Sequence, residues 1–174
     1  MLPSWKRLGP KPRESMTNPM AKRLAMLGDL RDAQQEAIQP ISMRIRDFQV
    51  EDIEAIVEIL KLNGQYGFPE VDGPEAMRRV KHCQAAVFLV CEIEGKVVGV
   101  VRGTYDGSRA MIHQLSVHPA YQRQGIGRAL VEEIVRRFQE MGAPTVSATV
   151  TEESFPFWQK LGFKRTKAFL VGNW

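Results

Sequence analysis

The stretch from Leu115 to Leu130 limits the possible folds most, because it joins an apolar strand pattern to a long helix pattern through a loop with two glycines. The strand pattern ends at Val117, and Pro119 prevents its continuation. Gly125 and Gly127 stand directly before the amphipathic helix. Such a loop directs several backbone N–H groups into one concavity at a helix N-terminus, where they attract phosphate oxygens. We therefore expect a phosphate-binding turn.

Two common phosphate-binding motifs do not match this loop. A dinucleotide fold runs its strand almost directly into G-x-G-x-x-G and places an acidic residue about twenty positions later. Here seven residues separate Val117 from Gly125, the third glycine position holds Leu130, and the next strand pattern ends at Val150 without an acid. A P-loop is excluded because no Gly-Lys-Ser/Thr follows.

The rest of the chain alternates between strand and helix patterns. Strand patterns cover residues 43–48, 87–93, 96–104, 110–117, 145–150 and 164–171, and helix patterns begin near residues 51 and 74 and cover 126–141 and 155–161. Residues 63–73 are rich in Gly and Pro and predict a loop. Short turns join the middle strands, which is typical of antiparallel pairing. The pattern predicts an α+β domain with a mixed, mostly antiparallel sheet of six to seven strands and about four helices.

The first 42 residues differ from the rest in composition. Residues 1–17 hold three prolines among basic and polar residues, which predicts a flexible tail. From Asn18, which can cap a helix, leucines and an alanine recur at three-residue steps. We interpret residues 1–42 as an N-terminal extension and residues 43–174 as the domain. The alternative is a partner-docking helix, through which the chain could form a homodimer.

Composition and charge exclude several functional classes. The longest apolar run, residues 85–91, has seven residues, against the roughly 20 of a membrane-spanning helix. The first twenty residues carry basic side chains without an apolar stretch behind them, so they do not predict a secretory signal, and we expect a cytoplasmic protein without membrane contact. The spacing of Cys83 and Cys91 predicts neither a disulfide framework nor a metal site. The net charge of +4 divides into +3 for residues 1–42 and +1 for the rest, so we expect no nucleic-acid partner.

The order of motifs carries a family resemblance. The pattern V-x-P-x-x-Q-x-x-G-x-G-x-A-L from Val117 to Leu130 is followed by a strand pattern and then by F-W-x-x-L-G-F from Phe157 to Phe163. This order resembles the GNAT superfamily of N-acetyltransferases over essentially residues 43–174. The resemblance implies the acyl-CoA N-acyltransferase fold and transfer of an acetyl group from acetyl-coenzyme A to a primary amine of a small molecule or peptide. It implies direct attack in a ternary complex. The alternative is a non-catalytic acyl-CoA sensor.

The resemblance also implies a set of cofactor-binding residues. The strand that ends in Leu115, Ser116 and Val117 would pair with the pantetheine arm. The loop would hold the pyrophosphate through Gln122, Arg123, Gln124, Gly125, Ile126, Gly127 and Arg128. Thr151 and Trp158 stand where the family commonly has Asn and a proton-donating Tyr, and we interpret Trp158 as a packed wall of the cofactor site.

The acceptor amine must lose a proton, because an amine with a pKa near about 10.4 is almost fully charged at neutral pH. His113, on the strand that leads to the cofactor loop, is the candidate general base. The alternative is a histidine at the edge of the core that is bonded to backbone. The resemblance places the acceptor near residues 63–73, so Tyr66, Glu70 and Asp72 are candidate acceptor-site residues. A simple solvated loop is the alternative for the two carboxylates.

Overall fold

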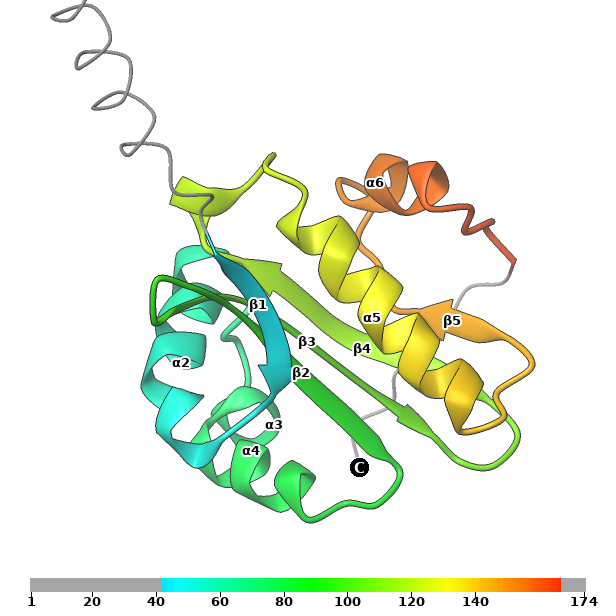
Figure 1. Cartoon of the computed structure of the whole chain (residues 1–174), viewed down its shortest axis with the longest axis horizontal. Coiled ribbons are helices and arrows are strands. Elements are labelled where there is room, and N and C mark those ends of the chain that lie inside the picture. Colours follow the sequence, from blue (N-terminus) through cyan, green and yellow to red (C-terminus); the bar gives the residue numbers. More distant parts are fainter. Residues whose placement is uncertain (1–41, 167–174) are drawn as a thin grey trace, which may run out of the picture. The chain divides into compact units, whose positions relative to one another are not determined.

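The computed structural model describes residues 42–166, which form a five-stranded sheet in the order β1-β2-β3-β4-β5 (Figure 1). The strands are β1 (Met43–Asp47), β2 (Ala86–Ile93), β3 (Lys96–Tyr105), β4 (Ala110–Val117) and β5 (Val146–Ala148). The first four strands are antiparallel neighbours, and β5 is parallel to β4. The predicted mixed, mostly antiparallel sheet is confirmed.

Helices cover both faces of this sheet. They are α2 (Ile53–Leu62), α3 (Pro69–Asp72), α4 (Pro74–Lys81), α5 (Ile126–Glu140) and α6 (Phe155–Lys160), with short 3₁₀ turns at Val50–Asp52 and Pro119–Tyr121. In Figure 1, α5 crosses one face, while α2 and α4 lie on the other.

The core consists of two apolar layers, because successive strand residues point to opposite faces. Val101 packs in the layer that contains Leu130 and Phe138 of α5. Its neighbour Val100 packs in the layer that contains Leu60 of α2. These buried strands and helices fix the position of β4, which carries the candidate site.

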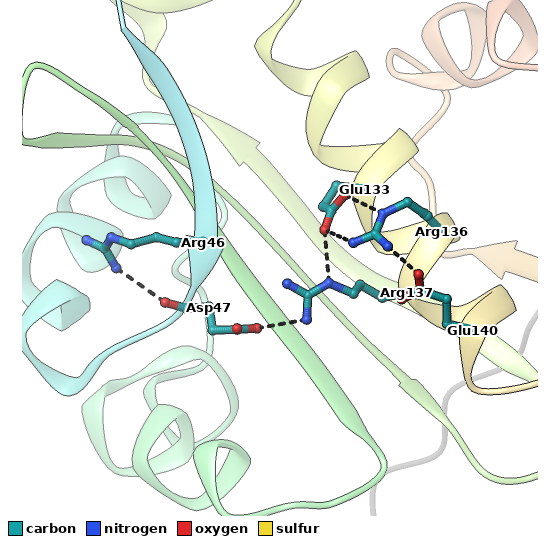
Figure 2. Close-up of polar contacts among 6 residues, drawn as sticks. All are labelled: Arg46, Asp47, Glu133, Arg136, Arg137 and Glu140. Atoms are coloured by element: carbon teal, nitrogen blue, oxygen red, sulfur yellow. Dashed lines mark hydrogen bonds and ion pairs between the residues drawn. The ribbon is translucent and has the colours of Figure 1, made fainter.

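A chain of ion pairs connects the C-terminal half of α5 to the edge strand β1 (Figure 2). Glu133 accepts hydrogen bonds from Arg136 at 2.6 Å and from Arg137 at 2.9 Å, and Arg137 reaches Asp47 of β1 at 3.4 Å. The two arginine side chains hold the pKa of the Glu133 carboxyl at about 2. Partly exposed pairs of this kind contribute little each, so they orient α5 rather than supply the stability of the fold.

The expected elements agree with the structure except in three places. Residues 63–73 do not form a loop throughout, because Phe68 and Pro69 begin the four-residue helix α3. Proline at the first helical position is already in the required φ range, which the loop prediction overlooked. The strand expected over 145–150 is shorter, since only Val146–Ala148 pair with β4. The strand predicted over 164–171 is not formed at residues 164–166, and the rest of it lies outside the described residues, as do the helix and tail predicted within 1–41.

Candidate active site

The start of α5 presents a row of backbone N–H groups without acceptors. Gly125 occupies the N-cap with φ of 86°, and Arg123 also has a positive φ of 65°. From Arg123 to Arg128, no backbone N–H donates to another described residue, and the first bond of the helix runs from Ala129 N to Gly125 O at 3.0 Å. A loop in which consecutive N–H groups converge on a helix N-terminus is an anion-binding geometry.

The glycine at position 127 is not required by the packing of the chain itself. A Cβ atom built there would be 3.5 Å from the ring of Phe157 and 3.7 Å from Val117, which are ordinary contacts. Gly125, in contrast, needs its positive φ, a conformation that side chains rarely adopt. The space over Gly127 therefore fits the close approach of a phosphate group to the backbone.

Beside this turn, β4 and β5 separate. The two strands pair only from Ala110 to Ile112, and a last bond joins Thr149 N to Ile112 O at 3.0 Å. Backbone groups of successive strand residues point alternately to the two neighbouring strands. His118 N bonds to Val98 O, so the backbone groups of His118 point toward β3. Leu115 and Val117 lie an odd number of residues before His118, so their backbone groups point the other way, toward the open edge. An extended molecule can pair with this edge.

Side-chain amides already occupy the carbonyl groups of that edge. Gln65 Nε2 donates to Leu115 O at 3.3 Å, and Val117 O accepts from Asn63 Nδ2 at 2.9 Å and from Gln122 Nε2 at 3.0 Å. The N–H groups of Leu115 and Val117 are left to bind a ligand carbonyl. Sequence reasoning missed Asn63 and Gln65, since both lie fifty or more residues from their partners.

The side chains of two predicted cofactor-binding residues form hydrogen bonds within the fold. Ser116 is buried, and its Oγ accepts from Asn63 Nδ2 at 2.7 Å. Gln122 lies against Asn63 Oδ1, at 3.1 Å, and against the Val117 carbonyl. Both residues fix the corner between β4 and the glycine loop, and the backbone N–H of Gln122 already donates to Pro119 O at 3.4 Å.

His113 occupies a β-bulge in β4. Arg102 of β3 pairs with Gln114 and Gly103 pairs with Ile112, so His113 is the extra residue between them. Its Nε2 lies 2.8 Å from Thr104 Oγ1, so its partner is a side chain and not the backbone group of the alternative interpretation. Desolvation at the sheet surface and the charge of Arg102 lower the pKa of His113, although part of the ring remains open to solvent. The lowered pKa favours the neutral imidazole, which is the form that accepts a proton.

Of the candidate acceptor residues, Asp72 is the one that contacts β4. Its Oδ1 accepts from Arg102 at 3.0 Å and from Gln114 Nε2 at 3.1 Å. The Arg102 side chain is 9% exposed and that of Asp72 15%, so Asp72 is not a free, solvated carboxylate. Glu70 is exposed, and Tyr66 lies under Lys61, with Nζ 5.2 Å from the ring centroid. The Oε1 atom of Gln114 is buried without a partner among the described residues.

Trp158 belongs to the core. It is 3% exposed, and its ring meets Phe157 and Phe163 edge-on at centroid distances of 5.4 and 5.1 Å. Thr151 closes a turn with Ser154 before α6. A cavity between α5, β5 and α6 is lined by Arg128, Thr151 and Trp158, but not by the two glycines of the loop.

Two further observations concern residues 42–166. No cluster of three or more His, Cys, Asp or Glu side chains in that range could hold a metal ion. None of its helices has the length and apolar character needed to cross a membrane.

Comparison with models of known protein families identifies the family of this chain. The model of the acetyltransferase (GNAT) family matches residues 53–163, which is more than half of the chain. Among solved structures, a transcriptional regulator from Bacillus halodurans C-125 is 25% identical with a TM-score of 0.66, and the match covers 76% of this chain and 100% of that one.

Two other solved structures share the fold at lower identity. A PaiA N-acetyltransferase from Thermoplasma acidophilum, solved in complex with coenzyme A, is 21% identical with a TM-score of 0.66, over 74% of this chain and 94% of that one. A glucosamine-6-phosphate N-acetyltransferase from Arabidopsis thaliana is 18% identical with a TM-score of 0.62, over 76% of this chain and 98% of that one.

Proposed function

Because the chain belongs to the acetyltransferase (GNAT) family, whose co-substrate is acetyl-coenzyme A, we propose that it acetylates the primary amine of a small molecule or peptide. The observation that carries the proposal is the row of unpaired N–H groups from Arg123 to Arg128 beside the open edge of β4. Phosphate groups fit the first feature, and an extended amide-containing arm fits the second.

We place the residues in the following roles. The N–H groups of the loop bind phosphate, and those of Leu115 and Val117 orient the arm along β4. Arg128 adds a positive charge, and its pair with Glu132 at 2.8 Å is exposed and easily exchanged. Ser116 and Gln122 hold the corner between strand and loop. Thr151 and Trp158 bound the cavity beside α5, where they would border the co-substrate.

Bound acetyl-coenzyme A supplies an electrophilic thioester carbon. In a ternary complex the amine nitrogen forms the new C–N bond, the C–S bond breaks, and the thiolate takes up a proton. His113 accepts the proton that the acceptor ammonium must lose. A covalent route through Cys91 is disfavoured, because Cys91 is fully buried and burial raises the pKa of its thiol to about 11.

The activity assay combines the full chain, acetyl-coenzyme A and a panel of primary amines, and measures release of free thiol together with the acetylated amine. We expect saturable turnover with at least one amine and intersecting initial-rate patterns. Parallel patterns, or an acetyl group trapped on Cys83, would contradict direct transfer. Binding of acetyl-coenzyme A without turnover on any amine would instead favour the non-catalytic sensor.

The His113→Gln substitution tests the proposed base. In the wild type, kcat/KM should fall on the acidic side as the imidazole becomes protonated. The midpoint should lie below the ordinary histidine value of about 6.5, because the pKa of His113 is lowered. The variant should lose this limb and about 10²–10⁴-fold in rate, as measured by pH profiles of kcat/KM.

The Thr104→Val variant is the matched control, since it removes the 2.8 Å partner of His113 and keeps the imidazole. It should retain an acidic limb. If the acidic limb of the kcat/KM profile were unchanged in His113→Gln, the base would be Glu70, Asp72 or a bound water.

A further inference from the structure

The residues around α3 present an apolar surface. Phe68 is 68% exposed and Val71 is 57% exposed, the two highest values among the large hydrophobic residues of the described chain. Phe68 is the N-cap of α3 with an extended backbone, and its carbonyl accepts a hydrogen bond from Val71 N at 2.9 Å, so both residues belong to the start of the same short helix. Exposed apolar side chains that gather beside a binding site mark a contact surface for a ligand.

This surface adjoins the part of β4 where the reaction would occur. Asp72, which follows Val71, reaches Gln114 of β4, and Gln65 reaches the Leu115 carbonyl. The segment from Gln65 to Asp72 is therefore tied to β4 beside His113. An amine that approaches the open edge near His113 passes this segment.

Charge on the same segment is balanced. Arg102 neutralises Asp72 in a mostly buried pair and also donates to the Val71 carbonyl at 3.4 Å. Arg79 donates to the backbone carbonyl of Glu70 at 3.2 Å, which brings a second positive charge to this segment. Desolvation and the charge of Arg102 lower the pKa of His113, which disfavours a positive charge there. The segment from Gln65 to Asp72 therefore lacks the excess of negative charge that attracts a polycation.

We infer that the acceptor carries a single positive charge on an apolar body, and that Phe68 and Val71 bind this body beside the open edge of β4. The inference rests on the proposed acetyltransferase function and narrows its substrate class. Polyamines and other polycations are not held by charge attraction at this surface. An alkyl or aryl group binds more tightly, because it leaves water when it contacts Phe68 and Val71.

The test is a series of linear primary alkylamines of increasing length, with spermidine as the polycation, measured with the full chain and saturating acetyl-coenzyme A. We expect kcat/KM to rise by about fourfold for each methylene group that becomes buried, until the surface is covered. Spermidine should be a poorer substrate than the longer monoamines. In the Phe68→Ser variant the dependence on length should flatten, with unchanged thermal stabilisation by acetyl-coenzyme A.

Two further variants sharpen the result. Met141→Ser is the matched control, because Met141 is also an exposed hydrophobic residue but lies after the C-terminus of α5. It should leave the dependence on length unchanged. Arg102→Gln should raise the ratio of kcat/KM for spermidine over a monoamine by about fivefold, the factor for one nearby unit charge at about 1 kcal/mol. A ratio measured on one preparation does not depend on how much of that preparation is folded.

The outcomes separate this inference from the function on which it rests. Acetylation without dependence on chain length, or a preference for spermidine, would overturn the inference and leave the acetyltransferase function standing. Stabilisation by acetyl-coenzyme A with no turnover of any amine would overturn the proposed function itself.

Discussion

The Gly127→Glu variant is expected to lose acetyl-coenzyme A binding while it keeps its fold. A Cβ atom at position 127 meets only ordinary contacts from Phe157 and Val117, so the backbone there accommodates the start of a side chain. Replacing a helical glycine also favours the helix by a few tenths to about 1 kcal/mol. The glutamate carboxylate would occupy the concavity of unpaired N–H groups and repel phosphate oxygens.

Thermal unfolding with and without acetyl-coenzyme A measures this effect. A ligand at about 100 times its Kd stabilises the wild type by roughly 2.7 kcal/mol, and the variant should gain nothing. The matched control is Gln139→Glu, which adds the same charge to the exposed, opposite end of α5. Equal stabilisation of Gly127→Glu and the wild type would contradict the phosphate-binding role of the loop.

The Trp158→Ala variant should lower the free energy of unfolding by about 3–5 kcal/mol. Trp158 is buried in the layer that contains Leu130 and Ile134 of α5, and its ring meets Phe157 and Phe163, so truncation leaves a cavity. Domains of this size are stable by about 5–15 kcal/mol in total, so the loss is a large fraction. Chemical denaturation followed by circular dichroism measures it.

The Trp158→Phe variant separates packing from cofactor contact, because it retains an aromatic ring in the same place. It should recover most of the lost stability. If Trp158→Ala lost less than about 1 kcal/mol of stability but bound acetyl-coenzyme A far more weakly, the residue would act chiefly as the cofactor-site wall predicted from the sequence.

Features encoded by neighbouring residues could be predicted from the sequence. The apolar row of α5, the strand that ends at Val117 and the two glycines between them form one continuous signal. The antiparallel strands β2 to β4 also follow from local alternation and turns. The four-residue helix α3 was missed, because it is too short to show a helical period, and its start depends on one proline.

Features that depend on contacts between distant residues could not be predicted. The bulge at His113 follows from the register between β3 and β4, which residue types alone do not determine. The pair between Asp72 and Arg102 joins residues thirty positions apart, and the bond from Asn63 to Val117 spans fifty-four. The sequence therefore suggested which residues surround the site, but not which carboxylate was neutralised or which carbonyls were occupied.

The unpaired N–H groups from Arg123 to Arg128 allow the amino-acid sequence of this loop to vary among relatives. Every residue except proline supplies a backbone N–H, so the donors persist when the side chains at positions 123, 124 and 126 change. Selection would then act on the shape of the loop, through its positive φ at Gly125 and the absence of a side chain at Gly127. Relatives that bind the same phosphates could retain few identical residues here besides these two glycines.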